Sequence, residues 1–191
     1  MVDRPAGHQV VVIGVSAGGM AAMEELLPAF PATYPWPIVV VQHLHPVQDT
    51  SFIQRLNEKS ALTVKEADEK EPLEAGHAYF APPNYHLLIE DDQTFSLSVD
   101  EKVHYARPAI DVLFESAADV YGVGVFGVIL TGANDDGAQG LRLIKERGGL
   151  AIVQDPATAQ APFMPQAALA ATQVDHVLAL PEITGLLVEK G

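Results

Sequence analysis

Short continuous runs of apolar residues alternate along the chain with longer segments in which apolar residues recur at helical spacing. The runs are rich in β-branched residues, which is typical of strands buried on both faces of a sheet. The longer segments are closed by Pro or by Gly pairs, which favours helices. We predict strands at 9–14, 37–42, 62–64, 77–81, 124–130, 150–154 and 176–180, and helices at 20–30, 51–60, 108–121, 137–147, 164–172 and 181–189.

This alternation predicts the fold class. Strands that alternate with helices form a mostly parallel sheet covered by helices on both faces. Two further strands, 86–90 and 94–99, flank Asp91-Asp92-Gln93 and predict a β-hairpin. We therefore expect an α/β fold: a three-layer, mostly parallel, doubly wound, Rossmann-like sheet with an inserted antiparallel hairpin. A length of 191 residues without an internal linker suits a single domain, 1–191.

Composition and charge exclude several classes of function. The chain has 11 Lys and Arg against 25 Asp and Glu, a net charge of −14, which argues against nucleic acid and anionic membranes as partners. The chain has no run of about 18 apolar residues, so we expect no insertion into a membrane. The absence of Cys excludes thiolate metal sites and a Cys nucleophile. The first residues lack a signal peptide, so we expect a soluble, cytoplasmic protein.

Polar side chains follow three of the buried strands. Ser16 follows the first strand, His43 the second, and Asp135 and Asp136 the strand at 124–130. Ligands of open parallel sheets bind at the carboxyl ends of the strands, so these groups converge. A hydroxyl, an imidazole and a carboxylate are the set needed for nucleophilic acyl transfer. From the residues alone, either Asp could orient His43 while the other caps the following helix.

The turn from Gly14 to Gly19 has two interpretations. It joins a strand to a helix, as a nucleophile elbow does, and the Ala17 N–H lies where it could stabilise an oxyanion. Glycine-rich turns of this kind more often bind phosphate or a dinucleotide. However, no Gly-Lys-Ser/Thr follows, and His43 stands where a ribose-binding acid belongs.

The other histidines carry weaker signals. His77, His86 and His104 do not show the spacing of a metal site, and we expect the first two on or beside strands. His45, two residues beyond His43, is expected in solvent. These residues leave a metal site possible but give it no support.

Six stretches of the sequence, in order and over nearly the whole chain, resemble one family: the chemotaxis protein-glutamate methylesterases, or CheB catalytic domains. The stretches are VVVIGVSAGGMAAMEELL at 10–27, VVVQHLHP at 39–46, VKEADEKEPLEAGHAYFAPPNYHLL at 64–88, RPAIDVLFESAA at 107–118, VILTGANDDGAQGL at 128–141 and AIVQDPATAQAPFMPQAAL at 151–169.

The resemblance implies a serine hydrolase that needs neither metal nor cofactor. It would demethylate glutamate methyl esters, and also deamidate glutamines, on the cytoplasmic helices of chemoreceptors or on related signalling proteins. In the family motif Ser16 is the nucleophile, His43 the base and Asp136 the acid that orients the base. We assign the backbone at Ala17 and Ala133 to the oxyanion site.

The chain departs from the family pattern at four positions. Ala17 stands where Thr is common, and Ala133 and Asn134 stand where Met-Gly is common. We expect Asn134 to tolerate a backbone conformation suited to Gly. Phe163 stands where Gly is usual and is expected to narrow the site.

Two further expectations concern the type of protein. Because the resemblance begins at the first strand of the catalytic domain, we expect a chain without the receiver domain that usually regulates this activity. The alternative function is a non-catalytic signalling module, or one that binds a phosphate or a partner, that retains the methylesterase fold.

Overall fold

The computed structural model describes residues 9–43 and 51–191. Within these ranges the strands are β1 (Val10–Val15), β2 (Ile38–Gln42), β3 (Thr63–Glu66), β4 (His77–Phe80), β5 (His86–Ile89), β6 (Phe95–Ser98), β7 (Val125–Ile129), β8 (Leu150–Gln154) and β9 (His176–Leu178). The helices are α1 (Gly19–Leu26), α2 (Ser51–Lys59), α3 (Ile110–Tyr121), α4 (Ala138–Glu146), α5 (Phe163–Ala171) and α6 (Leu180–Lys190), with 3₁₀ turns η1 (Leu27–Ala29) and η2 (Gly122–Gly124).

Seven strands form one sheet, in the order β3-β4-β2-β1-β7-β8-β9. Every strand pair in this sheet is parallel, so the prediction of a mostly parallel sheet is confirmed. Strand β1 lies between β2 and β7. Beyond β7 the strands follow in chain order, whereas beyond β2 the chain forms the edge strand β3 before it returns to β4. The side chains of β1 are buried on both faces, which is why its sequence is an unbroken apolar run.

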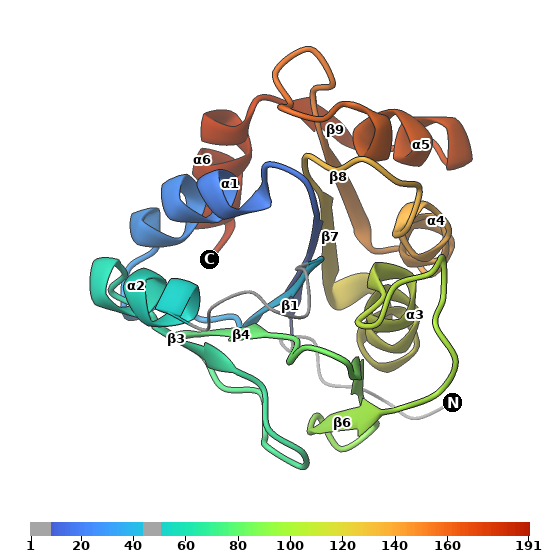
Figure 1. Cartoon of the computed structure of the whole chain (residues 1–191). Helices are drawn as coiled ribbons and strands as arrows, with labels where there is room; N and C mark the ends of the chain where they lie inside the picture. The colour runs from blue at the N-terminus through green and yellow to red at the C-terminus, as the bar shows by residue number, and fades with distance from the viewer. Residues whose placement is uncertain (1–8, 44–50) are drawn as a thin grey trace.

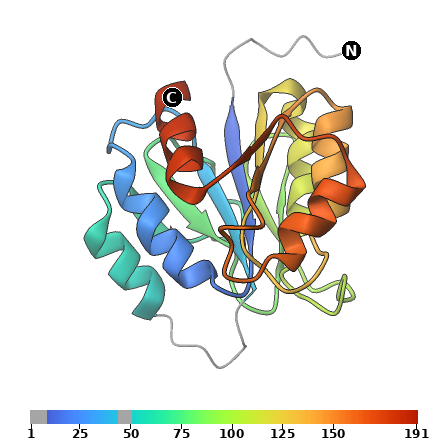
Figure 2. The same cartoon turned by 90° about the horizontal axis from the view of Figure 1, so that it is seen from above.

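Helices cover both faces of the sheet (Figure 1), and a hydrophobic core lies on each face. The turned view shows α1, α2 and α6 on one side of the sheet and α3, α4 and α5 on the other (Figure 2). One core contains Leu26, Phe52 and Leu187, from the first group of helices. The other contains Phe114 and Ile144, from the second group. The three predicted layers are therefore present.

The predicted hairpin is also present, as a sheet of its own. Strands β5 and β6 pair antiparallel and are not hydrogen-bonded to the main sheet. The hairpin packs against α3, whose Ser116 hydroxyl accepts a hydrogen bond from the Ile89 N–H at 3.1 Å. His77 and His86 begin β4 and β5, as expected.

Two helix boundaries differ from the prediction for physical reasons. The α1 helix ends at Leu26, because Pro28 has no N–H to continue it, and the chain forms the 3₁₀ turn η1 instead. The α3 helix begins at Ile110, so Pro108, which we expected in its first turn, precedes it. Among the described residues, no helix is long and apolar enough to cross a membrane.

Candidate functional site

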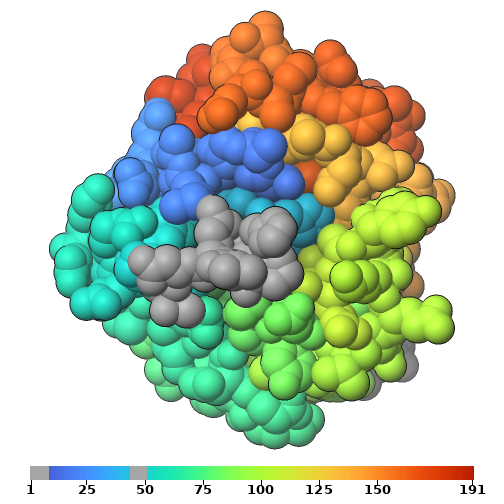
Figure 3. Space-filling view, in the orientation of Figure 1, coloured from blue at the N-terminus to red at the C-terminus, as the bar shows by residue number. Residues whose placement is uncertain are grey.

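Three neighbouring strands bring the predicted site residues to one edge of the sheet. Beyond β1, the Ser16 N–H donates to the Thr131 carbonyl at 3.0 Å, just past β7. On the other side, the His43 N–H donates to the Val15 carbonyl at 3.0 Å. In the space-filling view, the blue atoms after β1 lie beside the yellow-orange atoms after β7 (Figure 3). The convergence expected from the strand ends is thus observed.

The turn between β1 and α1 requires a glycine. Gly18 has a φ of 82°, in the left-handed region, and is the N-cap of α1. A Cβ at this position would also lie 2.8 Å from the Gln160 side chain. This turn places Ser16 and the Ala17 N–H at the amino end of α1. Within the described residues, no hydrogen bond is found for the Ala17 or the Ala133 N–H.

Two polar side chains that were not predicted from the sequence hold this turn in place. The Thr131 hydroxyl donates to the Ala17 carbonyl at 2.7 Å and accepts from the Ala161 N–H at 2.8 Å. On the other side, the buried Gln42 amide donates to the Ser16 carbonyl at 2.9 Å and to the His43 carbonyl at 3.2 Å. Thr131 and Gln42 are polar residues at the ends of buried strands, and this position in the sequence could have indicated that they belong to the site. Together they fix the backbone of the turn without a hydroxyl at position 17.

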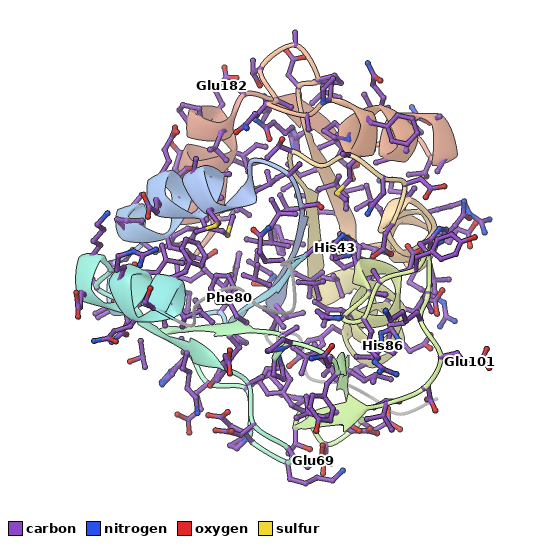
Figure 4. All side chains as sticks on the ribbon, in the orientation of Figure 1. His43, Glu69, Phe80, His86, Glu101 and Glu182 are labelled. Carbon is purple, nitrogen blue, oxygen red and sulfur yellow. The ribbon has the colours of Figure 1, made fainter. Side chains whose placement is uncertain are left out.

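His43 and Asp136 are in direct contact. The His43 Nε2 lies 2.8 Å from the Asp136 Oδ2, and the side chains are 13% and 0% exposed. Figure 4 labels His43, which lies near the centre of that face. The carboxylate of Asp136 also accepts the first N–H groups of α3, from Ile110 at 2.7 Å and Asp111 at 3.0 Å. Asp136 therefore caps α3, and this cap fixes the carboxylate that holds the imidazole.

The neighbouring Asp135 does not cap α4, which was one of the two readings the sequence left open. The N-cap of α4 is Gly137, which has no side chain, and the Asp135 carboxylate accepts no N–H of this helix. The Asp135 Oδ1 instead lies 3.2 Å from the Nδ1 of His104, at the surface. Of the two carboxylates, only Asp136 contacts His43.

The second nitrogen of His43 is also engaged. The Asn134 side-chain Nδ2 lies 3.2 Å from the His43 Nδ1. Asn134 is not among the described residues with positive φ, so the tolerance we expected it to need is not required. Ser16 is involved in neither ring contact of His43.

Ser16 and His43 line one pocket of about 430 Å³. Its walls are Ser16, Ala17, Gly18, Gly19, Met20, Ala21, Gln42, His43 and Gln160. Small residues dominate beside the hydroxyl, which allows a substrate carbonyl to approach closely. Phe163 is not part of this lining, and its side chain is 55% exposed at the start of α5. Our expectation that Phe163 narrows the site is therefore wrong for this pocket.

The remaining histidines that the structure describes are not part of a metal-binding group. In the described parts of the chain, no group of three or more His, Cys, Asp or Glu residues could hold a metal ion. The His86 Nε2 is 2.9 Å from the Glu101 carbonyl, which ties the hairpin to the next loop. His45, which we expected to be solvated, lies outside the described residues.

Asp111 is a buried titratable group that the sequence reasoning missed. Its Oδ1 accepts the Gly140 N–H at 2.6 Å, and its Oδ2 lies 3.3 Å from the His104 Nε2. Burial raises the pKa of Asp111 to about 6, with a smaller contribution from the nearby Asp136 charge, against the lowering effects of the Gly140 N–H and His104. An Asp in the first turn of a helix favours an interaction with that helix's own amino end. That position of Asp111 in the sequence therefore did not indicate its contact with Gly140 of α4.

Comparisons with known proteins point to one family. The family model of the CheB methylesterases matches residues 11–187. A putative protein-glutamate methylesterase/protein-glutamine glutaminase of Leptospira interrogans is 53% identical over 181 residues, which cover 95% of this chain and 94% of that protein. Protein-glutamate methylesterase/protein-glutamine glutaminase 4 of Hahella chejuensis is 40% identical, over 95% of this chain but only 48% of its own length.

A solved structure gives the same result. The chain superposes on the crystal structure of the Thermotoga maritima CheB methylesterase catalytic domain with a TM-score of 0.93 and 35% identity. The alignment covers 97% of this chain and 100% of that one. The fold expected from the sequence is therefore confirmed at the level of a known structure.

Proposed function

This chain belongs to the CheB methylesterase family, which consists of carboxylic ester hydrolases, and we propose that it hydrolyses glutamate methyl esters on chemoreceptor helices or related signalling proteins. The proposal also includes deamidation of glutamine on the same substrates, as the names of its relatives state for them. The observation that carries the proposal is the His43–Asp136 contact beside a pocket that Ser16 lines.

In the first proposed step, the Ser16 Oγ attacks the carbonyl carbon of the ester. His43 takes the hydroxyl proton on Nδ1, the ring nitrogen that does not face Asp136. The carbonyl oxygen becomes an oxyanion. The N–H groups of Ala17 and Ala133, which make no hydrogen bond to a described residue, are the donors that we assign to it.

In the second proposed step, the tetrahedral intermediate collapses. The bond from carbon to the methoxy oxygen breaks, and His43 returns its proton to that oxygen, so methanol leaves. A water molecule then attacks the acyl-enzyme, His43 takes one of its protons, and Ser16 leaves with that proton. The product is a glutamic side chain, which ionises. With glutamine as substrate, ammonia leaves in place of methanol.

Asp136 acts through His43 in this scheme. Its carboxylate holds the Nε2–H of the imidazole and stabilises the imidazolium that forms during attack. Because two N–H groups of α3 also bind it, Asp136 cannot rotate away without uncapping the helix.

One experiment separates this proposal from a non-catalytic module of the same fold. Methanol release from methylated receptor fragments is measured together with labelling by a fluorophosphonate, for the wild type, Ser16→Ala and Ser96→Ala. Ser96 lies on β6, in the hairpin, and is the matched serine control. We expect the wild type and Ser96→Ala to release methanol and to be labelled, and Ser16→Ala to do neither. No labelling and no methanol release from the wild type would favour the non-catalytic module.

A further inference from the structure

The Asn134 amide covers the nitrogen of His43 that the proposed reaction needs. The Nδ2 of Asn134 is 3.2 Å from the Nδ1 of His43. The orientation of this amide is fixed from its other end, because the Asn134 Oδ1 accepts the Asp136 N–H at 3.2 Å. An oxygen that accepts a backbone N–H leaves the NH₂ group to face the imidazole.

The same contacts determine which ring nitrogen carries the proton. The Asp136 Oδ2 accepts from the Ile110 N–H and lies 2.8 Å from the His43 Nε2, so this nitrogen is the donor to the carboxylate. In a neutral imidazole the other nitrogen then has only a lone pair. The Nδ1 of His43 is therefore an acceptor, and Asn134 supplies its donor.

A ring nitrogen of this type has one lone pair in the ring plane and accepts one good hydrogen bond. Ser16 and Asn134 therefore compete for the same atom. From this competition, and resting on the function proposed above, we propose that Asn134 is a positioning residue that occupies the His43 Nδ1 in the free protein and yields it to Ser16 when a substrate binds.

Asn134 is well placed for such an exchange. Its side chain is half-buried, and its neighbours in the loop, Ala133 and Asp135, are exposed. Asn134 links the proposed base to the acid that holds it, because one end of its amide binds the backbone N–H of Asp136 and the other end binds His43. A shift of this loop on binding at the Ala133 N–H would move the amide away from the ring.

The closing experiment uses three substitutions in one loop. In Asn134→Ser the hydroxyl can still accept the Asp136 N–H but is too short to reach the imidazole. In Asn134→Asp the acceptor is retained, and an oxygen replaces the donating NH₂ group. Asp135→Asn is the matched control, because Asp135 contacts His104 rather than His43.

The first readout is catalytic. A net hydrogen bond of ordinary strength corresponds to about a three- to tenfold change in an equilibrium. We expect Asn134→Ser to raise kcat/KM for methylated receptor fragments by about three- to tenfold. We expect Asn134→Asp to lower it, since a carboxylate against Nδ1 favours a protonated ring that cannot act as a base. A kcat/KM for Asn134→Ser that is unchanged or lower than that of the wild type overturns the proposal.

The second readout does not depend on hydrolysis. The ¹⁵N resonances of the His43 ring are recorded in the free protein at about pH 8.5, where an ordinary imidazole is neutral. We expect the Nδ1 resonance to move in Asn134→Ser and to stay in place in Ser16→Ala and Asp135→Asn. Movement in Ser16→Ala, with none in Asn134→Ser, would show that Ser16 already holds this nitrogen and overturns the proposal. Because the spectrum needs no substrate, it tests the contact even if the wild type releases no methanol.

Discussion

Asp136 and Asp111 are two buried carboxylates that cap each other's helices, and each of them holds a histidine. Asp136 precedes α4 and accepts the first N–H groups of α3, whereas Asp111 lies in α3 and accepts the Gly140 N–H of α4. Asp136 contacts His43, and Asp111 contacts His104. The two His–Asp pairs are thus built from the same contacts at the junction of two helices.

The close packing of α3 and α4 makes this arrangement possible. A Cβ on Gly140 would lie 2.5 Å from the Cβ of Phe114, so a larger residue would push the helices apart. At the observed distance the amino ends of both helices lie within reach of a carboxylate from the other. Each carboxylate meets the partial positive charge of a helix amino end.

The two pairs differ in what faces the second nitrogen of the imidazole. His43 is 13% exposed and lines a pocket with Ser16. His104 is 36% exposed, and its Nδ1 faces a second carboxylate, that of Asp135, at 3.2 Å. A ring between two carboxylates has no hydroxyl to activate. In the proposed mechanism, therefore, a His–Asp pair alone does not make a catalytic site, because a hydroxyl and a pocket must accompany it.

Replacement of each of the two histidines by Gln should give the largest difference in kcat between the two His–Asp pairs. His43→Gln removes the proposed base, and loss of the base of a serine hydrolase lowers kcat by a factor on the order of 10⁴ to 10⁶. His104→Gln should leave kcat within about threefold, since a partly exposed ion pair contributes little. Single-turnover methanol release measures both. Comparable losses in the two variants would show that the pairs are not distinct in function.

Replacement of the acid should have the next largest effect. Asp136→Asn places an amide NH₂ group against the N–H donors of α3 or against the His43 Nε2–H, so the ring loses its fixed tautomer. By analogy with a triad acid, kcat should fall by about 10³ to 10⁴. KM should change little, since Asp136 does not line the pocket. Circular dichroism checks that the variant keeps its helix content despite the altered cap of α3. A fall of less than tenfold in kcat would indicate that Asp136 serves only as a cap.

The fold was predictable from the sequence because its strands are buried on both faces. Strand β8 was predicted with its observed bounds, and the order of elements was correct throughout the described residues. Boundaries were less accurate where a distant side chain determines them. The start of α3 depends on the Asp136 carboxylate, 26 residues away in sequence, and no local pattern encodes that contact.

The candidate site was predictable for a similar reason, and only in part. Ser16, His43 and Asp136 each follow a strand, so the parallel sheet alone brings them to one edge. Which of two adjacent Asp residues meets His43 depends on the path of the loop after β7, which the residue types do not reveal. The contacts of Asp111 and Asn134 likewise depend on tertiary packing, so neither role was found from the sequence.

The buried Asp111 gives the third prediction, on stability. Its folded pKa of about 6 lies above the ordinary value of 3.8, so the folded state binds the proton more tightly than the unfolded state. Its protonation therefore stabilises the fold below about pH 4, and this contribution is lost as the pH rises to about 6. The loss corresponds to about 3 kcal/mol, and it should be missing in Asp111→Asn, whose amide oxygen can still accept the Gly140 N–H.

Urea unfolding of the wild type and of Asp111→Asn at several pH values between 4 and 7 measures this difference. Titrating groups distant from Asp111 are common to both proteins, so their effects cancel in the comparison. The wild type should lose stability relative to the variant as the pH rises. Parallel curves for the two proteins would mean that Asp111 does not titrate in this range.

The smallest expected effect is that of Asp135→Asn, which tests whether the two neighbouring carboxylates have been assigned correctly. The side chains of Asp135 and His104 are 60% and 36% exposed, so their contact is screened by water and salt. Loss of such a pair should lower the free energy of unfolding by at most about 1 kcal/mol. The decrease should shrink further in 0.5 M sodium chloride, because the Debye length falls to about 4 Å there.

Since Asp135 makes no contact with His43, kcat should stay within about twofold of the wild type. Urea unfolding at two salt concentrations and the methanol assay measure these effects. A loss of kcat as large as that of Asp136→Asn would mean that Asp135 swings in to replace its neighbour at His43 when substrate is bound, and the distinction drawn between the two His–Asp pairs would fail.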